Sequence, residues 1–199
     1  MSRETLANTL AQLYSEAVDG YAFYANQSRA QAAQAAEAGQ TITIAPGIVD
    51  EELRNRANAD INAKREAALQ AVQSEREAAK RELTNAPTDA EANYIVAIST
   101  RDDLTEAEAL AGLERYHSHA AQHAIASAAK RSGLRHIIAS TDTERYLNDL
   151  ADVERQINRA FSPFDIMAAS DGQKLANVAA LKAAALGKSD DIFTLLAQQ

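Results

Sequence analysis

The chain has 199 residues, of which 46% are hydrophobic, and its net charge is −8 with no cysteine. Acidic and basic residues are interleaved, which argues against general nucleic-acid binding and against binding to anionic membranes, because both need a basic surface. Without cysteine, disulfides and thiolate catalysis are excluded. Aromatics make up only 5% and Gly and Pro are rare, a composition typical of long helices that each bury a narrow stripe.

The first predicted element is a long helix over residues 3–38. One face of it carries apolar residues at the three- and four-residue spacing of a helix, namely Leu6, Leu10, Leu13, Ala17, Tyr21 and Tyr24. Gly39 is a suitable C-terminal stop. The stretch TITIAPG (41–47) follows and alternates Ile with Thr. It is either an extended connector or a short strand that pairs with a partner's sheet edge, since so short a strand cannot stand alone.

A second long helix is predicted over residues 49–84. Its apolar stripe steps by four and seven residues through Ala57, Ile61, Ala68, Val72, Ala79 and Leu83. This eleven-residue period indicates a nearly straight or slightly right-handed supercoil. Two helices of matched length joined by a short connector predict an antiparallel hairpin over residues 1–86. Because its large apolar residues are few, we expect another helix or another subunit to complete it, with Ile61, Val72 and Leu83 as contact residues.

The remainder, residues 87–199, predicts a bundle of shorter helices, so the fold class is all-α. Three capping boxes mark helix starts: Thr88 with Glu91 opens 89–100, Thr105 with Glu108 opens 106–131, and Thr141 with Glu144 opens 142–160. Gly133 ends the second of these helices, and the basic residues before it are interpreted as complementing the helix dipole rather than binding nucleic acid.

The C-terminal part predicts three more helical segments. Ser162 and Pro163 start one, because proline is tolerated at the first helical position. Asp171–Gly172 is a point where that helix can break, before a segment over 173–186 that ends at Gly187. Ser189 is predicted to cap a last short helix, whose apolar face is Ile192, Phe193 and Leu196. This terminal helix would dock either on its own bundle or on a partner.

Three of the four histidines lie within ERYHSHAAQH, residues 114–123. In an unbroken helix over 106–131, His117 lies on the apolar face and is expected to be partly buried, whereas His119 and His123 share the opposite face. That pair can chelate Zn²⁺ or Ni²⁺ only with further ligands, which we expect only from a partner chain. Glu114 and His117 form one ExxH step, whereas di-iron bundles use two.

No motif in the sequence indicates catalysis. HExxH, a Gly-rich phosphate loop and GxSxG are all absent. The histidine-rich segment is therefore interpreted as ordinary helix, and we predict no catalytic residue, no cofactor and no metal ligand. No apolar run approaches the roughly 18 residues of a membrane span, and the N-terminus lacks a signal-peptide core. We expect a cytoplasmic protein, or a virion component if the chain is phage-encoded.

The predicted function is that of a non-enzymatic structural or assembly protein, which acts through protein partners as a homo-oligomer or within a larger assembly. In composition the chain resembles accessory and assembly proteins of tailed phages, which are often acidic, helical and rich in Ala, Glu, Gln and Arg. The resemblance implies a virion, scaffold or adaptor component. One alternative is a helical module that inhibits or recruits a partner protein. A second is a four-helix-bundle metalloprotein that uses Glu114 and His117.

Overall fold

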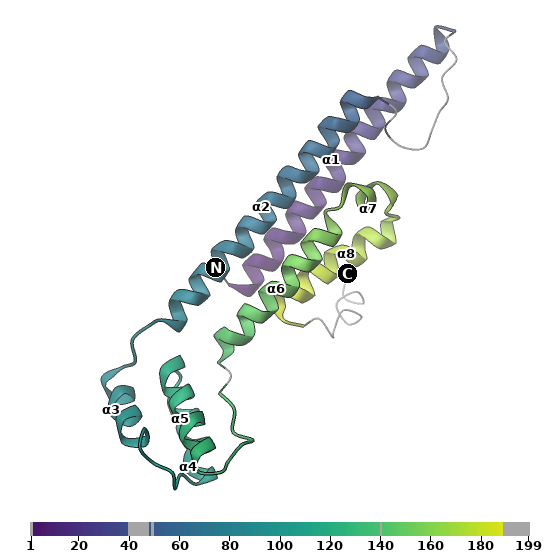
Figure 1. Cartoon of the computed structure of the whole chain (residues 1–199). Helices are drawn as coiled ribbons and strands as arrows, with labels where there is room; N and C mark the ends of the chain where they lie inside the picture. Colours follow the sequence, from purple (N-terminus) through teal and green to yellow (C-terminus); the bar gives the residue numbers. More distant parts are fainter. Residues whose placement is uncertain (1, 40–47, 49, 140, 189–199) are drawn as a thin grey trace. The chain divides into compact units, whose positions relative to one another are not determined.

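The computed structural model describes residues 2–39, 48, 50–139 and 141–188. Within these residues the chain is all-α, as predicted (Figure 1). Its eight helices are α1 (Arg3–Glu37), α2 (Glu51–Leu83), α3 (Asp89–Ile98), α4 (Glu106–Arg115), α5 (His119–Arg131), α6 (Asp142–Ala160), α7 (Pro163–Ala168) and α8 (Asp171–Leu186). No helix in this described part combines the length and the apolar character that a bilayer crossing requires. The TITIAPG segment and the helix predicted after Ser189 lie outside the described residues.

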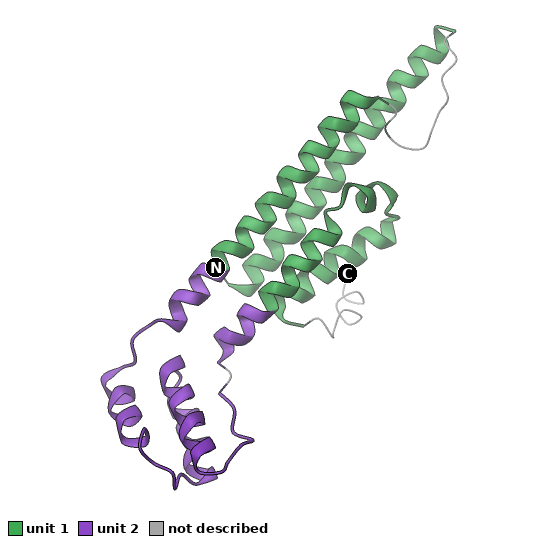
Figure 2. Ribbon diagram, in the orientation of Figure 1, with its two compact units in different colours: residues 1–75, 149–199 green, residues 76–148 purple. Residues whose placement is uncertain are grey.

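The contacts of the chain group it into two compact units (Figure 2). Unit 1 consists of residues 1–75 and 149–199, and unit 2 consists of residues 76–148. Unit 1 therefore holds α1, α7, α8 and the larger parts of α2 and α6, and unit 2 holds α3, α4 and α5. The predicted domain boundary at residue 86 stays a prediction.

In unit 1, α1 and α2 pack side by side and antiparallel (Figure 1). The predicted apolar stripes form most of the buried faces, whereas Leu13, Tyr21 and Tyr24 of α1 and Leu83 of α2 are half-buried. In α1 the buried apolar residues are Leu6, Ala7, Leu10, Ala11, Tyr14, Ala17 and Ala25, and in the part of α2 that belongs to unit 1 they are Leu53, Ala57, Ile61, Ala68 and Val72. A Cβ atom built on Gly20 would lie 2.5 Å from a carboxylate oxygen of Asp60, so the Asp60 side chain of α2 reaches α1 at this glycine.

The chain itself completes the long hairpin, through α6 and α8. Tyr14 of α1 is 1% exposed and packs edge-to-face on Phe161 with ring centroids 5.6 Å apart. The Asn177 amide on α8 donates to the Tyr14 hydroxyl at 2.9 Å. On α2, the Arg65 guanidinium donates to the Asn158 side-chain oxygen of α6 at 2.6 Å. The core of unit 1 is therefore built from four helices of one chain.

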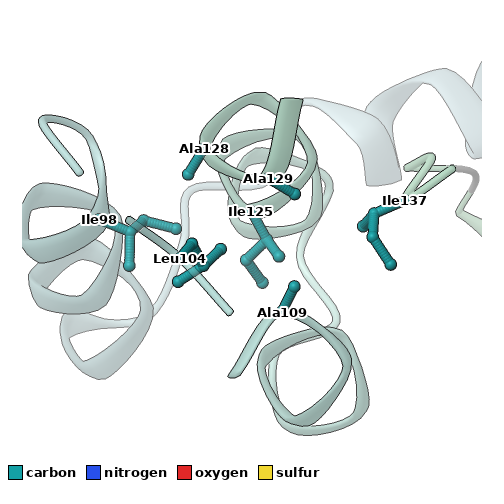
Figure 3. Close-up of a cluster of buried hydrophobic side chains, with 7 residues drawn as sticks. All are labelled: Ile98, Leu104, Ala109, Ile125, Ala128, Ala129 and Ile137. Carbon is teal, nitrogen blue, oxygen red and sulfur yellow. The ribbon is translucent and has the colours of Figure 1, made fainter. Parts of the chain in front are cut away.

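Unit 2 has a separate small core between α3, α4 and α5 (Figure 3). Its buried residues are Ile98, Leu104, Ala109, Ile125, Ala128, Ala129 and Ile137. Figure 3 shows Ile125 at the centre, between Leu104 and Ala109. Gly112 of α4 faces this core, and a Cβ atom there would lie 2.7 Å from the Tyr94 hydroxyl and 3.2 Å from a methyl of Ile125. The close approach of α4 to α5 therefore depends on a glycine.

The prediction of one helix over 106–131 is wrong. Helix α4 ends at Arg115 and α5 begins at His119, with Ser118 as its N-cap. Two contacts stabilise the break. Tyr116, which has extended backbone angles, stacks on Tyr94 with ring centroids 4.4 Å apart. The backbone N–H of Ser118 donates to Glu91 at 3.0 Å. These tertiary contacts outweigh the helix propensity of the intervening residues.

Most of the other helix starts and stops predicted within the described residues are confirmed. All three capping boxes form, with each Thr hydroxyl accepting from the Glu backbone N–H and each Glu carboxylate accepting from the Thr backbone N–H. Gly133 and Gly187 adopt the left-handed conformation after α5 and α8, where glycine carries no Cβ penalty. Helix α8 begins at Asp171 with Ser170 as its N-cap, so the predicted break at Asp171–Gly172 is a helix start.

Candidate functional site

The predicted contact residues of the long hairpin lie in different places. Ile61 is 1% exposed and Val72 is fully buried, both by other helices of this chain. Leu83, at the end of α2, is half-buried. Ile61 and Val72 are thus core residues that offer no accessible surface in this structure. The tail residues Ile192, Phe193 and Leu196 lie outside the described residues.

Unit 1 also has an apolar groove, which is accessible, unlike the core residues Ile61 and Val72. Helix α7 starts at Pro163, where Ser162 caps it, and the next residues turn large side chains outward. Phe164 is 69% exposed and Met167 is 49% exposed. They border a cavity of about 210 Å³. Its lining residues are Tyr21, Ile48, Arg54, Ala57, Asn58, Pro163, Phe164 and Met167.

The floor of the groove is apolar. Ile48, Leu53, Ala57 and Ala25 form a buried cluster at this end of the hairpin. Tyr21 packs against the cluster, and burial raises the pKa of its hydroxyl. Above this floor, covering one exposed Phe or Met side chain would contribute about 1.5–3 kcal/mol. The groove can therefore bind an apolar side chain, but it presents no acid–base pair for catalysis among the described residues that line it.

The structure corrects the prediction for His117. Because the helix breaks before Ser118, His117 lies in the connection between α4 and α5 and is exposed. Glu114 is also exposed, in the last turn of α4. The ExxH step therefore does not lie on one continuous helix. Glu114 and His117 thus lack the shared helix face that a di-iron bundle requires.

The predicted pairing of His119 with His123 is confirmed. Both lie on one face of α5, with ring centroids 4.2 Å apart. The expectation that further ligands would come only from another chain stays a prediction, but Glu144 of α6 provides a candidate third ligand in the same chain, beside both histidines. Glu144 comes from the third capping box, and the sequence contains no local pattern that joins it to residues 119 and 123.

We find no match for the chain among models of protein families, among curated proteins or among solved structures. The class that the fold defines is an all-α protein with a long antiparallel helical pair.

Sequence reasoning missed the groove on α7. Phe164 and Met167 lie in PFDIMA, where the apolar residues indicate a buried helix face as readily as an exposed one. Only Ile166 of this segment is buried. The length of α7 is known only from the structure, so the sequence offered no signal that separates Phe164 and Met167 from Ile166.

Proposed function

We propose that this protein is a non-enzymatic structural or assembly component that works as an oligomer through the apolar groove of unit 1. The observation that carries the proposal is the exposure of Phe164 and Met167 above an apolar floor. Exposed apolar patches of this kind mark protein–protein contacts. A second copy of the chain is the expected occupant, and a larger assembly would use the same contact.

Two features of unit 1 support the proposal. Its core is already complete, so Phe164 and Met167 are not needed to stabilise the monomer. In addition, every side chain from Arg29 to Glu37 in α1 is exposed or half-buried, although this stretch contains five alanines. Such a helix end has little tertiary stabilisation of its own, and a second subunit would supply it.

The test is sedimentation velocity over a range of concentrations, on the full chain and on a Phe164→Ser, Met167→Ser double variant. We expect the native chain to self-associate. The double variant should raise the dissociation constant about 30-fold or more, since losing one buried aromatic anchor costs about 2 kcal/mol or more. Because both side chains are exposed in the monomer, the double variant should keep the helix content of the native chain.

Val96→Ser is the matched control, since Val96 is 72% exposed but lies on α3 in unit 2. It should leave self-association unchanged. A strict monomer at high micromolar concentration would contradict the oligomer. Equal association of the native chain and the double variant would contradict the assignment to the groove.

A further inference from the structure

A cluster in unit 2 brings together His119, His123 and Glu144, residues that the proposed function does not use. One ligand-type atom of each lies within 4.8 Å of the other two. The Nε2 atom of His123 is 3.0 Å from Oε1 of Glu144, and Nδ1 of His119 is 3.7 Å from the same oxygen. Two ligand atoms on one tetrahedral zinc ion are about 3.3 Å apart, given bonds of about 2.0–2.1 Å. These two separations bracket that value.

Each element of the cluster is positioned by a helix start. Ser118 caps α5, which makes His119 its first residue and places His123 one turn later. Glu144 belongs to the capping box of α6, where its Oε2 atom accepts from the Thr141 backbone N–H at 3.0 Å. The cap therefore occupies one carboxylate oxygen and leaves Oε1 directed at the two imidazoles. A ligand held in this way loses little side-chain freedom on binding an ion.

A second observation that points to a bound ion is the environment of the His119 ring. Its Nδ1 atom is buried, and among the described residues it has no hydrogen-bond partner. Buried polar atoms are almost always satisfied, and one that is not calls for an explanation such as a bound water or ion. The His123–Glu144 contact by itself is explained by a hydrogen bond. A hydrogen bond to Glu144 does not account for His119, whose nitrogen lies too far away at 3.7 Å.

We propose that His119, His123 and Glu144 bind one divalent transition-metal ion of the zinc class. Two neutral imidazoles and one carboxylate are ligands that zinc prefers, and three protein ligands leave one position for water. The bound metal would join α5 to the first turn of α6.

The experiment uses the full chain made without a histidine tag, stripped with a chelator and titrated with Zn²⁺ against a chromophoric competitor. We expect one ion per chain and a melting temperature that rises with zinc. His119→Gln and His123→Gln should each weaken binding more than about 100-fold, because loss of outer-shell partners alone costs about 10- to 100-fold. Co²⁺ in place of zinc should give visible absorption bands that both variants abolish.

Glu144→Gln removes the carboxylate but retains an oxygen for the cap, since glutamine also serves in a capping box. It should weaken zinc binding while circular dichroism stays native. The control is His136→Gln. His136 lies 3.1 Å from Glu106 and forms an exposed His–Glu pair outside the cluster, so its loss should not change the affinity. The site would be overturned if zinc binding survived both histidine substitutions or fell equally in the control. The absence of stoichiometric binding would also overturn it. None of these outcomes bears on self-association through the groove.

Discussion

In unit 1, α1 alone has 35 residues, and its buried side chains extend from Leu6 to Ser28 along the helix. In unit 2, the helices that lie wholly inside it have 10 to 13 residues. The long helices of unit 1 contact one another over many turns, so apolar packing accumulates along their length. The short helices of unit 2 have few turns to bury, and a larger share of their backbone N–H and C=O groups lies at unpaired helix ends.

Unit 2 compensates with polar side chains that connect helix ends. Glu91 is buried, and its carboxylate accepts from the backbone N–H of Thr88 at the start of α3 and from that of Ser118 at the start of α5. Arg131, at the end of α5, donates to the carbonyls of Ile98 and Ser99 at the end of α3. A stripe of apolar residues thus suffices for a long helix, whereas short helices also need partners for their ends.

The largest expected effect is the loss of a core aromatic in unit 1. Tyr14→Ala removes a fully buried ring and its contact with Phe161, and it should lower the free energy of unfolding by about 3–5 kcal/mol. Tyr14→Phe keeps the ring and loses only the Asn177 hydrogen bond, so it should cost about 1 kcal/mol. Urea denaturation followed by circular dichroism measures both. Equal losses in the two variants would show that polar contacts, not packing, dominate unit 1.

A smaller effect is expected from the carboxylate that links two helix starts in unit 2. Glu91→Gln leaves one of the two N–H groups facing an amide NH₂, and it should destabilise α3 and α5 by about 1–3 kcal/mol at neutral pH. Amide hydrogen exchange in these helices provides the measurement. Glu114→Gln, an exposed residue of α4, is the control and should change exchange little.

The same substitution predicts a pH dependence. Hydrogen bonds from the Ser118 and Thr88 backbone lower the pKa of Glu91 from 4.5 to about 2. A carboxyl group with a depressed folded pKa contributes stability that is present above its unfolded pKa and is lost as the pH falls through its folded pKa. The gap in unfolding free energy between the native chain and Glu91→Gln should therefore be constant above about pH 5 and close toward pH 2. A gap that stays constant to pH 2 would contradict this role.

The smallest expected effects come from a pair of helical glycines, one in each unit. At Gly20 an added Cβ meets only the end of the flexible Asp60 side chain, so Gly20→Ala should stabilise by up to about 1 kcal/mol through helix propensity. At Gly112 it meets the Tyr94 hydroxyl and Ile125, which is fully buried. Because Tyr94 is also stacked on Tyr116, Gly112→Ala should destabilise by about 1 kcal/mol. Melting temperatures of the two variants provide the measurement. Shifts of the same sign for Gly20→Ala and Gly112→Ala would contradict the expected difference between the two glycines.

Local chemistry predicted most helix boundaries. The Thr–x–x–Glu boxes, the proline at position 163 and the glycines at 133 and 187 act through backbone groups a few residues away, so a sequence contains all of the necessary information. The same holds for the stripe through Ala57, Ile61 and Val72, because helical periodicity alone decides that these residues share a face. It does not decide what covers that face.

The break at residues 116–118, the partners of the long hairpin and the neighbours of the histidines could not be predicted without the three-dimensional structure. Each depends on residues far apart in the chain: Glu91 with Ser118, Tyr14 with Asn177, and His123 with Glu144. Residue patterns alone predicted the all-α class, the two long helices and the positions of most helix ends. Which side chains meet across helices follows from the packing of whole elements, which periodicity and capping do not specify.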